Sequence, residues 1–203
     1  MLKINYNPCT QRRQFWINQL PQKAQDRLKE ITEGVWCVPK LIKLKKNRQP
    51  VEVKVGDIFL VSNREGLYFY GKVLQKTDPK CKPNQWIDNT YVAVIFNCTT
   101  QDKTLDNFSP NYKSFTAYPR LYEVGFWKKG YFEIIGNIPL TKEEKNMDIG
   151  FFDGNSKEGG VFINLEGKIM SHIPQYFSPF AWRTIMGVEL SLEEMLIEKT
   201  TSV

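Results

Sequence analysis

The chain has 203 residues, of which 13% are aromatic and 25% are charged, and its formal net charge is +6. So many aromatic and aliphatic side chains exclude an intrinsically disordered protein. The longest apolar run, residues 92–96, excludes a membrane-spanning helix, which needs roughly 20 apolar residues. The first residues contain no secretory apolar region, so we expect a cytoplasmic protein.

The positive charge is concentrated near the N-terminus. Residues 1–55 contain 12 Lys or Arg and 4 Asp or Glu, whereas residues 56–203 contain 16 and 18. The first quarter therefore carries a net +8 and the remainder is slightly acidic. A basic patch of this kind is typical either of a solvated loop or of a docking surface for an acidic partner.

The N-terminal segment is expected to form two helices. Thr10 could cap the first helix, which Pro21 would end, and Gly34 would end the second. Apolar residues of the second helix recur every three or four positions: Ala24, Leu28 and Ile31. Three apolar side chains of this segment are expected to pack on the main body: Phe15, Trp16 and Leu28.

The next segment is expected to be rich in strands. Residues 55–61 and 67–74, joined by a glycine-containing turn at 62–66, predict a hairpin. Residues 90–97 are almost continuously apolar, which is typical of a central strand buried on both faces. The polar residues 99–120, which include two prolines, predict a long loop or an irregular sheet edge.

The second half predicts more strands and a final helix. Residues 124–127 and 131–135 are expected to form a second hairpin. A further strand pair is expected at 149–152 and 161–165, followed by one more strand at 168–173. Ser191 and Glu194 match a capping box, which predicts a short helix over residues 192–198.

Together these elements predict an α+β fold with mainly antiparallel strands. We expect a curled sheet or a partly open barrel of six or more strands, because such curling limits exposed sheet edges. N-terminal helices and a short C-terminal helix would flank it. Residues 1–50 are expected to be a helical and basic segment packed on a β-rich domain at 51–203, both in one structural unit.

The residue types offer little catalytic apparatus. The one histidine, His172, is not part of a nucleophile motif, and no phosphate-binding glycine loop is present. The four cysteines lack the spacing of zinc or redox motifs, so we expect reduced, mostly buried thiols and predict no metal or cofactor. Five carboxylates near strand ends keep a hydrolase with a cleft between the hairpins as an alternative: Glu123, Glu133, Asp148, Asp153 and Glu166.

The first hairpin carries a family resemblance. The residues Val55-Gly56-Asp57-Ile58-Phe59 and the return strand ending in Gly71-Lys72-Val73 resemble the Immunity protein 26 family of bacterial polymorphic-toxin systems. The strand 91–96 and the segment 127–140 are also similar, so the resemblance covers roughly residues 50–170. Lys72 stands where this family often has Arg. The resemblance implies a β-rich, non-enzymatic protein that binds and blocks a cognate toxin.

Two kinds of partner follow from these observations. If the protein inhibits a toxin, an acidic toxin surface would suit the basic N-terminal segment. Exposed basic and aromatic residues are then the expected contacts: Lys45, Lys46, Arg48, Arg64 and Trp86. The alternative is a nucleic-acid-binding barrel that stacks bases on strand aromatics beside the lysines at 43–46: Tyr68, Tyr70 and Trp127.

Overall fold

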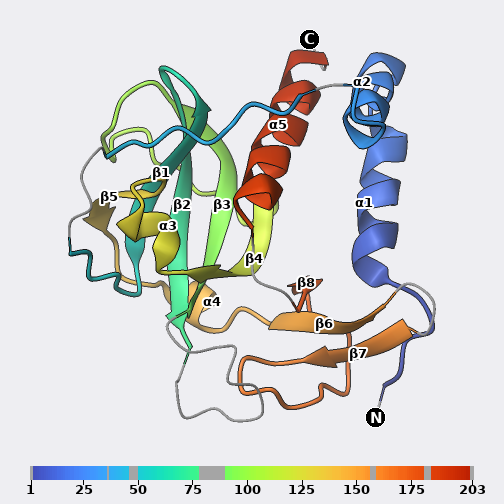
Figure 1. Cartoon of the computed structure of the whole chain (residues 1–203). Coiled ribbons are helices and arrows are strands. Elements are labelled where there is room, and N and C mark those ends of the chain that lie inside the picture. The colour runs from blue at the N-terminus through green and yellow to red at the C-terminus, as the bar shows by residue number, and fades with distance from the viewer. Residues whose placement is uncertain are drawn as a thin grey trace.

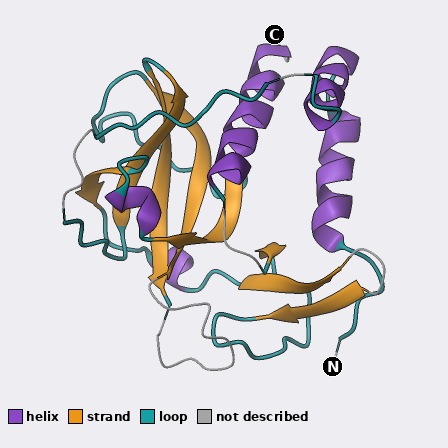
Figure 2. Cartoon of the chain, in the orientation of Figure 1, coloured by secondary structure: helices purple, strands orange, loops and turns teal. Residues whose placement is uncertain are grey.

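The computed structural model describes residues 2–35, 37–45, 50–77, 90–155, 159–180 and 184–201. In chain order these ranges contain α1 (Pro8–Gln19), α2 (Gln22–Thr32), β1 (Asp57–Arg64), β2 (Leu67–Lys76), β3 (Thr90–Thr100), β4 (Phe115–Glu123), α3 (Gly125–Lys128), β5 (Glu133–Asn137), α4 (Lys142–Lys145), β6 (Ile149–Asn155), β7 (Gly159–Ile163), β8 (Tyr176–Pro179) and α5 (Ile185–Thr201). Figure 2 shows the helices packed beside the strands. The predicted α+β class with mainly antiparallel strands is confirmed.

The larger sheet has five antiparallel strands in the order β4-β3-β2-β1-β5. The predicted first hairpin is confirmed as β1 and β2, with Leu60 opposite Tyr70. Its turn is shorter than expected, because both strands continue until only Glu65 and Gly66 separate them, and Gly66 has a φ of 70°. The predicted central strand is β3, which lies between β2 and β4 and is buried over residues 90–96.

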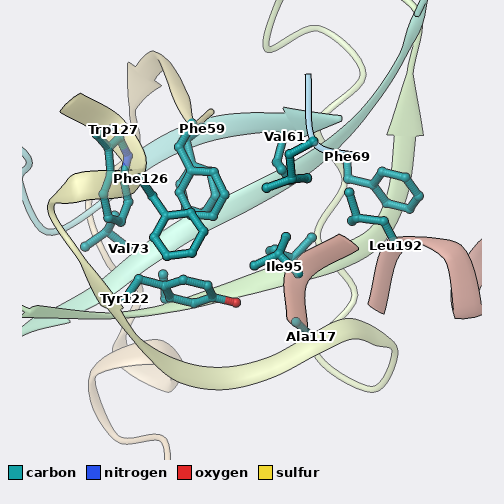
Figure 3. Packing of buried hydrophobic residues seen from close by; sticks show 14 of the residues in the cluster. Phe59, Val61, Phe69, Val73, Ile95, Ala117, Tyr122, Phe126, Trp127 and Leu192 are labelled. Carbon is teal, nitrogen blue, oxygen red and sulfur yellow. The ribbon is translucent and has the colours of Figure 1, made fainter. Parts of the chain in front are cut away.

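One face of this sheet packs against α3 and α5 (Figure 3). Phe59 lies at the centre of an aromatic cluster, stacked on Phe132 with ring centroids 4.5 Å apart. Gly71 lies directly beneath Phe59, and a Cβ there would come within 2.2 Å of the ring. The chain therefore needs glycine at this position so that β2 can pass under the aromatic ring. Leu192 of α5 covers the neighbouring part of the same face.

The opposite face is covered by the segment between β3 and β4. Leu105, Phe108 and Tyr112 of this segment pack on the buried side chains of the sheet. The Tyr70 hydroxyl also donates a hydrogen bond to the carbonyl of Thr104, at 2.8 Å. Residues 101–114 thus form the expected loop. Residues 115–120 belong to the edge strand β4, and its register with β3 shifts twice there, so the predicted irregular sheet edge is confirmed.

A second, smaller sheet has the order β7-β6-β8 (Figure 1). The predicted pairing of β6 with β7 is confirmed, and β8 adds an unpredicted strand parallel to β6. The Ser178 hydroxyl donates to the carbonyl of Pro119 at 2.6 Å and so joins β8 to β4 of the larger sheet. The strands therefore form two sheets rather than one sheet or barrel of six or more strands, because β6 pairs with β7 and β8 instead of extending the larger sheet.

The N-terminal helices differ from the prediction in two details. Asn7, not Thr10, caps α1, because its side-chain oxygen accepts the backbone N–H groups of Cys9 and Thr10. Phe15 is 68% exposed and does not pack on the body, so that expectation was wrong. Leu28 is buried on the face of α2 that packs against Ile197 of α5.

Two predicted strand features are absent from the described residues. Residues 125–128 form the short helix α3 rather than the first strand of a hairpin, and the Phe126 carbonyl accepts the backbone N–H groups of Tyr131 and Phe132. The following strand, β5, pairs with β1 instead. In the segment 168–173, which was expected to be a strand, Ile169 forms only an isolated bridge with Ile163.

The C-terminal helix is longer than expected. It begins at Ile185, so Ser191 lies within the helix and does not form the predicted capping box with Glu194. Instead the Thr184 hydroxyl accepts the backbone N–H of Gly187 at the start of α5. The predicted capping box was wrong because these two side chains have other roles: Ser191 is buried within the helix, and Glu194 pairs with Arg13 of α1.

Candidate functional site

Four of the six residues considered for catalysis, His172, Asp148, Glu133 and Glu166, form local side-chain pairs. His172 Nε2 lies 3.0 and 3.1 Å from the two carboxylate oxygens of Asp148, which also accepts the backbone N–H of Gln175. This pair joins the loop before β8 to the start of β6. Two more of the strand-end carboxylates pair with lysines, Glu133 with Lys103 and Glu166 with Lys168. These contacts stabilise loops and strand ends.

Metal-binding chemistry is not supported in the described ranges. They contain no group of three or more His, Cys, Asp or Glu side chains placed to hold a metal ion. Three cysteines with free thiols lie in these ranges: Cys9 and Cys98 are half-buried and Cys37 is exposed. The expectation of mostly buried thiols is therefore wrong for these three.

A buried ion pair joins β2 of the larger sheet to α4. Lys72 Nζ is 2.7 and 2.9 Å from the two carboxylate oxygens of Glu144, and each side chain is only 2% exposed. The same carboxylate accepts the backbone N–H of Thr141 and the hydroxyl of Tyr112. Since its oxygens are fully engaged, Glu144 holds α4 and the segment 101–114 against β2. Its role is structural.

A cleft with basic walls lies between α1, β4 and α5, and we call it the α1–β4–α5 cleft. It encloses about 410 Å³. Figure 1 shows α1 standing beside α5, with β8 at the foot of α1. Apolar side chains from the three elements form part of its lining: Trp16, Phe115, Ala117, Leu190 and Met195. Its charged lining consists of four cations and two carboxylates: Arg12, Arg13, Lys113, Arg120, Glu194 and Glu198.

Arg12 is the best-positioned cation of this cleft. Its guanidinium lies 3.7 Å from the centroid of the Tyr118 ring and 4.2 Å from that of Phe177. Nη1 donates a hydrogen bond to the Phe177 carbonyl at 2.8 Å. Burial lowers the pKa of Arg12, although a guanidinium remains charged at neutral pH. The two rings therefore hold a charged, planar group in one orientation.

The other charges of the α1–β4–α5 cleft are arranged differently. Arg13 pairs with Glu194 at 2.6 Å, so these two largely neutralise each other. Lys113 is exposed at the start of β4, and its ammonium forms no ion pair with a described residue. Burial raises the pKa of the Cys9 thiol, while the positive charges of Arg12 and Arg120 act in the opposite direction. The cleft is thus a net positive site with one fixed guanidinium.

A second groove lies between α2, α5 and the end of β1. It encloses about 640 Å³, and its charged lining is balanced between three cations and three carboxylates: Lys23, Arg27, Arg64, Asp26, Glu30 and Glu193. Arg64 binds both carboxylate oxygens of Glu193, at 2.9 and 2.8 Å, although its own side chain is 43% exposed. Arg64, a predicted contact residue, therefore already stabilises the position of α5.

The remaining predicted contact residues are only partly placed. Lys45 is exposed, and its backbone N–H donates to the carbonyl of Gly130 beside α3. Lys46, Arg48 and Trp86 lie outside the described residues. The described part of the chain thus brings none of the predicted contacts into the α1–β4–α5 cleft.

The aromatics proposed for base stacking are not accessible. Tyr70 is fully buried and Trp127 is 2% exposed, both within hydrophobic clusters of the larger sheet. Tyr68 is half-buried against the same sheet. These side chains fill the core, so the structure removes the main support for a nucleic-acid-binding barrel.

Sequence reasoning missed the cations of the α1–β4–α5 cleft, although α1 carried a signal. Cys9, Arg12, Arg13 and Trp16 all line the cleft, and their spacings of three, four and seven residues place them on one helical face. This face could have been identified as a mixed basic and apolar stripe. The facing residues of β4 and α5 had no such signal, because they are brought near α1 only by the fold.

The fold and the cleft together describe an α+β protein that presents a basic, partly apolar surface between its flanking helices and an edge strand. The sequence model of a known family, Immunity protein 26, matches residues 54–158, which are 105 of the 203 residues. The chain therefore belongs to the Immunity protein 26 family, as the first hairpin predicted. No curated protein and no solved structure matches it. Within the described residues, none of the helices combines the length and apolar character needed to cross a bilayer.

Proposed function

We propose that this protein neutralises a cognate toxin of a bacterial polymorphic-toxin or contact-dependent inhibition system by binding it directly. Its membership of the Immunity protein 26 family carries this proposal. The protein would act as a non-enzymatic inhibitor in the cytoplasm, where a toxin delivered by a neighbouring cell arrives. Binding alone is sufficient for this function, because occupying the toxin's active surface blocks its substrate.

The arrangement of charge supports a toxin with an acidic binding surface. Residues 1–55 carry a net +8, and complementary charge accelerates the association of two proteins and favours the correct partner. Lys45, Lys46 and Arg48 of this basic segment are proposed contacts, together with Arg64 and Trp86. We also propose that residues 1–50 and 51–203 form one unit, so that the basic segment is presented on the β-rich domain.

The decisive experiment is rescue of poisoned cells. The C-terminal domain of the toxin encoded beside this chain's gene is expressed from an inducible promoter, with or without the full chain. Growth should be restored only when the full chain is present, and the two proteins should co-purify. If neither rescue nor co-purification is observed, the proposed function is wrong.

Charge substitutions test the basic segment better than its deletion. Removing residues 1–50 would also remove Ala24 and Leu28, which pack on α5, and so would destabilise the body. Replacing Lys45, Lys46 and Arg48 by Glu reverses the charge without removing any helix. Weaker toxin binding is expected. The same substitution at three exposed lysines elsewhere on the chain, Lys142, Lys145 and Lys168, makes an equal change of charge and is the control.

A further inference from the structure

We propose that the α1–β4–α5 cleft is part of the surface that binds the toxin, and that its occupant is an acidic segment whose carboxylate binds the guanidinium of Arg12. This inference rests on the proposed function and specifies the partner surface that the function requires. The occupant is a stretch of polypeptide with at least one Asp or Glu side chain next to an apolar one.

The hydrogen-bonding state of Arg12 indicates a carboxylate ligand. A guanidinium has five N–H donors, and among the described residues Arg12 uses one of them, toward Phe177. Its plane is fixed between the rings of Tyr118 and Phe177. A half-buried guanidinium held in one orientation with unused donors is well suited to a carboxylate, which can accept two parallel hydrogen bonds from it.

The remaining lining favours a short acidic and apolar segment. Four cations face two carboxylates, so the cleft attracts negative charge overall. Trp16, Phe115 and Met195 offer apolar surface beside these charges. A volume of about 410 Å³ is in the range that accommodates a small ligand, which here corresponds to a few side chains rather than a whole domain.

The same lining argues for a protein over a nucleic acid. Glu194 and Glu198 interrupt the basic residues of the wall, and Glu194 already neutralises Arg13, so the cations do not form a continuous row. Nucleic-acid sites usually form a continuous basic track with exposed aromatic side chains. A polypeptide carries both acceptors and donors and can match this mixture of charges.

The cleft lies partly inside and partly outside the residues that the family model matches. The β4 wall lies inside the matched residues 54–158, whereas α1 and α5 lie outside them. An inhibitor that recognises one toxin needs a surface that is specific to its own chain. This cleft joins a strand of the family domain to two helices outside the match, so part of its lining lies beyond the residues that the family model covers.

The test measures binding of the full chain to the C-terminal domain of the neighbouring toxin by calorimetry and by association kinetics. Arg12→Lys keeps the charge but removes the planar fork, and we expect affinity to fall by about thirtyfold or more. Lys113→Glu changes an exposed residue with little risk to folding, and we expect a loss of roughly tenfold, mainly through slower association. Lys142→Glu, an exposed lysine on α4, is the matched control and should change affinity by less than about twofold.

The outcomes distinguish a failure of the cleft inference from a failure of the proposed function. If the wild-type chain binds the toxin domain and both cleft variants bind equally well, the cleft inference is overturned and the proposed function stands. If the wild-type chain does not bind, both are wrong. If Arg12→Lys does not fold, Lys113→Glu decides alone. Binding of a single-stranded DNA oligonucleotide is measured in the same way. If Lys113→Glu abolishes oligonucleotide binding and leaves toxin binding unchanged, the cleft binds nucleic acid and the inference is overturned.

Discussion

Charged side chains are buried and fully paired beneath the family-matched sheet, whereas those on the flanking helices are partly exposed and less completely paired. Between the sheet and α4, Lys72 and Glu144 are each 2% exposed, and the carboxylate accepts further hydrogen bonds from Thr141 and Tyr112. On the flanking helices, Arg13 and Glu194 form an ion pair with 42% and 15% exposure. Arg12 nearby keeps most of its donors unused among the described residues.

This difference distinguishes stability from recognition. A charge buried beneath the sheet must be fully paired, because removing either partner leaves an uncompensated buried charge. A charge on the rim of a cleft needs less compensation, since water solvates it until a partner arrives. The two regions should therefore respond differently to substitution, and four experiments can break or sharpen that contrast.

The largest effect is expected at the buried ion pair. Replacing Lys72 by Met leaves the Glu144 carboxylate without its cation, so the free energy of unfolding should fall by about 3–5 kcal/mol. Denaturant unfolding followed by tryptophan fluorescence measures this change. Adding Glu144→Gln removes the orphaned charge and should recover at least half of the loss. A Lys72→Met variant within about 1 kcal/mol of the wild type would contradict the contrast.

The next effect concerns the glycine beneath Phe59. An alanine at position 71 would place its Cβ within 2.2–2.8 Å of three atoms of that ring, so the tightly packed core must shift. We expect a loss of about 1–3 kcal/mol in the free energy of unfolding. Gly125→Ala is the control, because its Cβ would meet only a carboxylate oxygen of Glu123 at 3.8 Å. Equal stabilities of the two variants would show that the sheet core tolerates repacking.

A smaller effect is expected on the flanking helices. Arg13→Ala removes the ion pair with Glu194, but Arg13 is well exposed, so the free energy of unfolding should change by less than about 1 kcal/mol. The same unfolding experiment at low and high salt measures it. A loss above about 2 kcal/mol would mean that the helices depend on charge as strongly as the sheet does.

The smallest perturbation is a chemical label that leaves the fold intact. Burial raises the pKa of Cys9, so less thiolate is present there at neutral pH and alkylation by iodoacetamide should be slow. Cys37 is exposed and should react first. Peptide mass spectrometry of timed samples distinguishes the two sites, and the Cys9 rate should rise as the pH is raised. Equal rates at neutral pH would show that the α1–β4–α5 cleft opens more widely than the structure indicates.

Local pattern predicted the parts of the fold that local chemistry controls. The hairpin of β1 and β2 and the pair β6 and β7 followed from apolar runs separated by glycine-containing turns, and the buried strand β3 followed from its nearly uninterrupted apolar run. The segment 125–128 did not, because its aromatic residues suit a strand equally well. Only the packing of Trp127 and Phe132 around Phe59 favours a helical turn there.

The candidate cleft was less accessible to prediction. The helical face of Cys9, Arg12, Arg13 and Trp16 can be recognised in the sequence, but nothing in it indicates which residues lie opposite. Lys113 of the β3–β4 segment and Glu194 of α5 are about 100 and 180 positions away. Periodicity describes near neighbours along the chain, and these contacts are between distant segments.

The sequence by itself determined the α+β class, the family and the location of the basic charge, because composition and short-range periodicity carry that information. Only the tertiary structure decided that the strands divide into two sheets, that Phe15 is exposed and that α5 begins at Ile185. It also decided that Arg12 lies between two aromatic rings at the edge of a cleft. These features depend on which segments, distant in the sequence, bury their apolar surfaces against each other, and only the packing of the whole chain determines that.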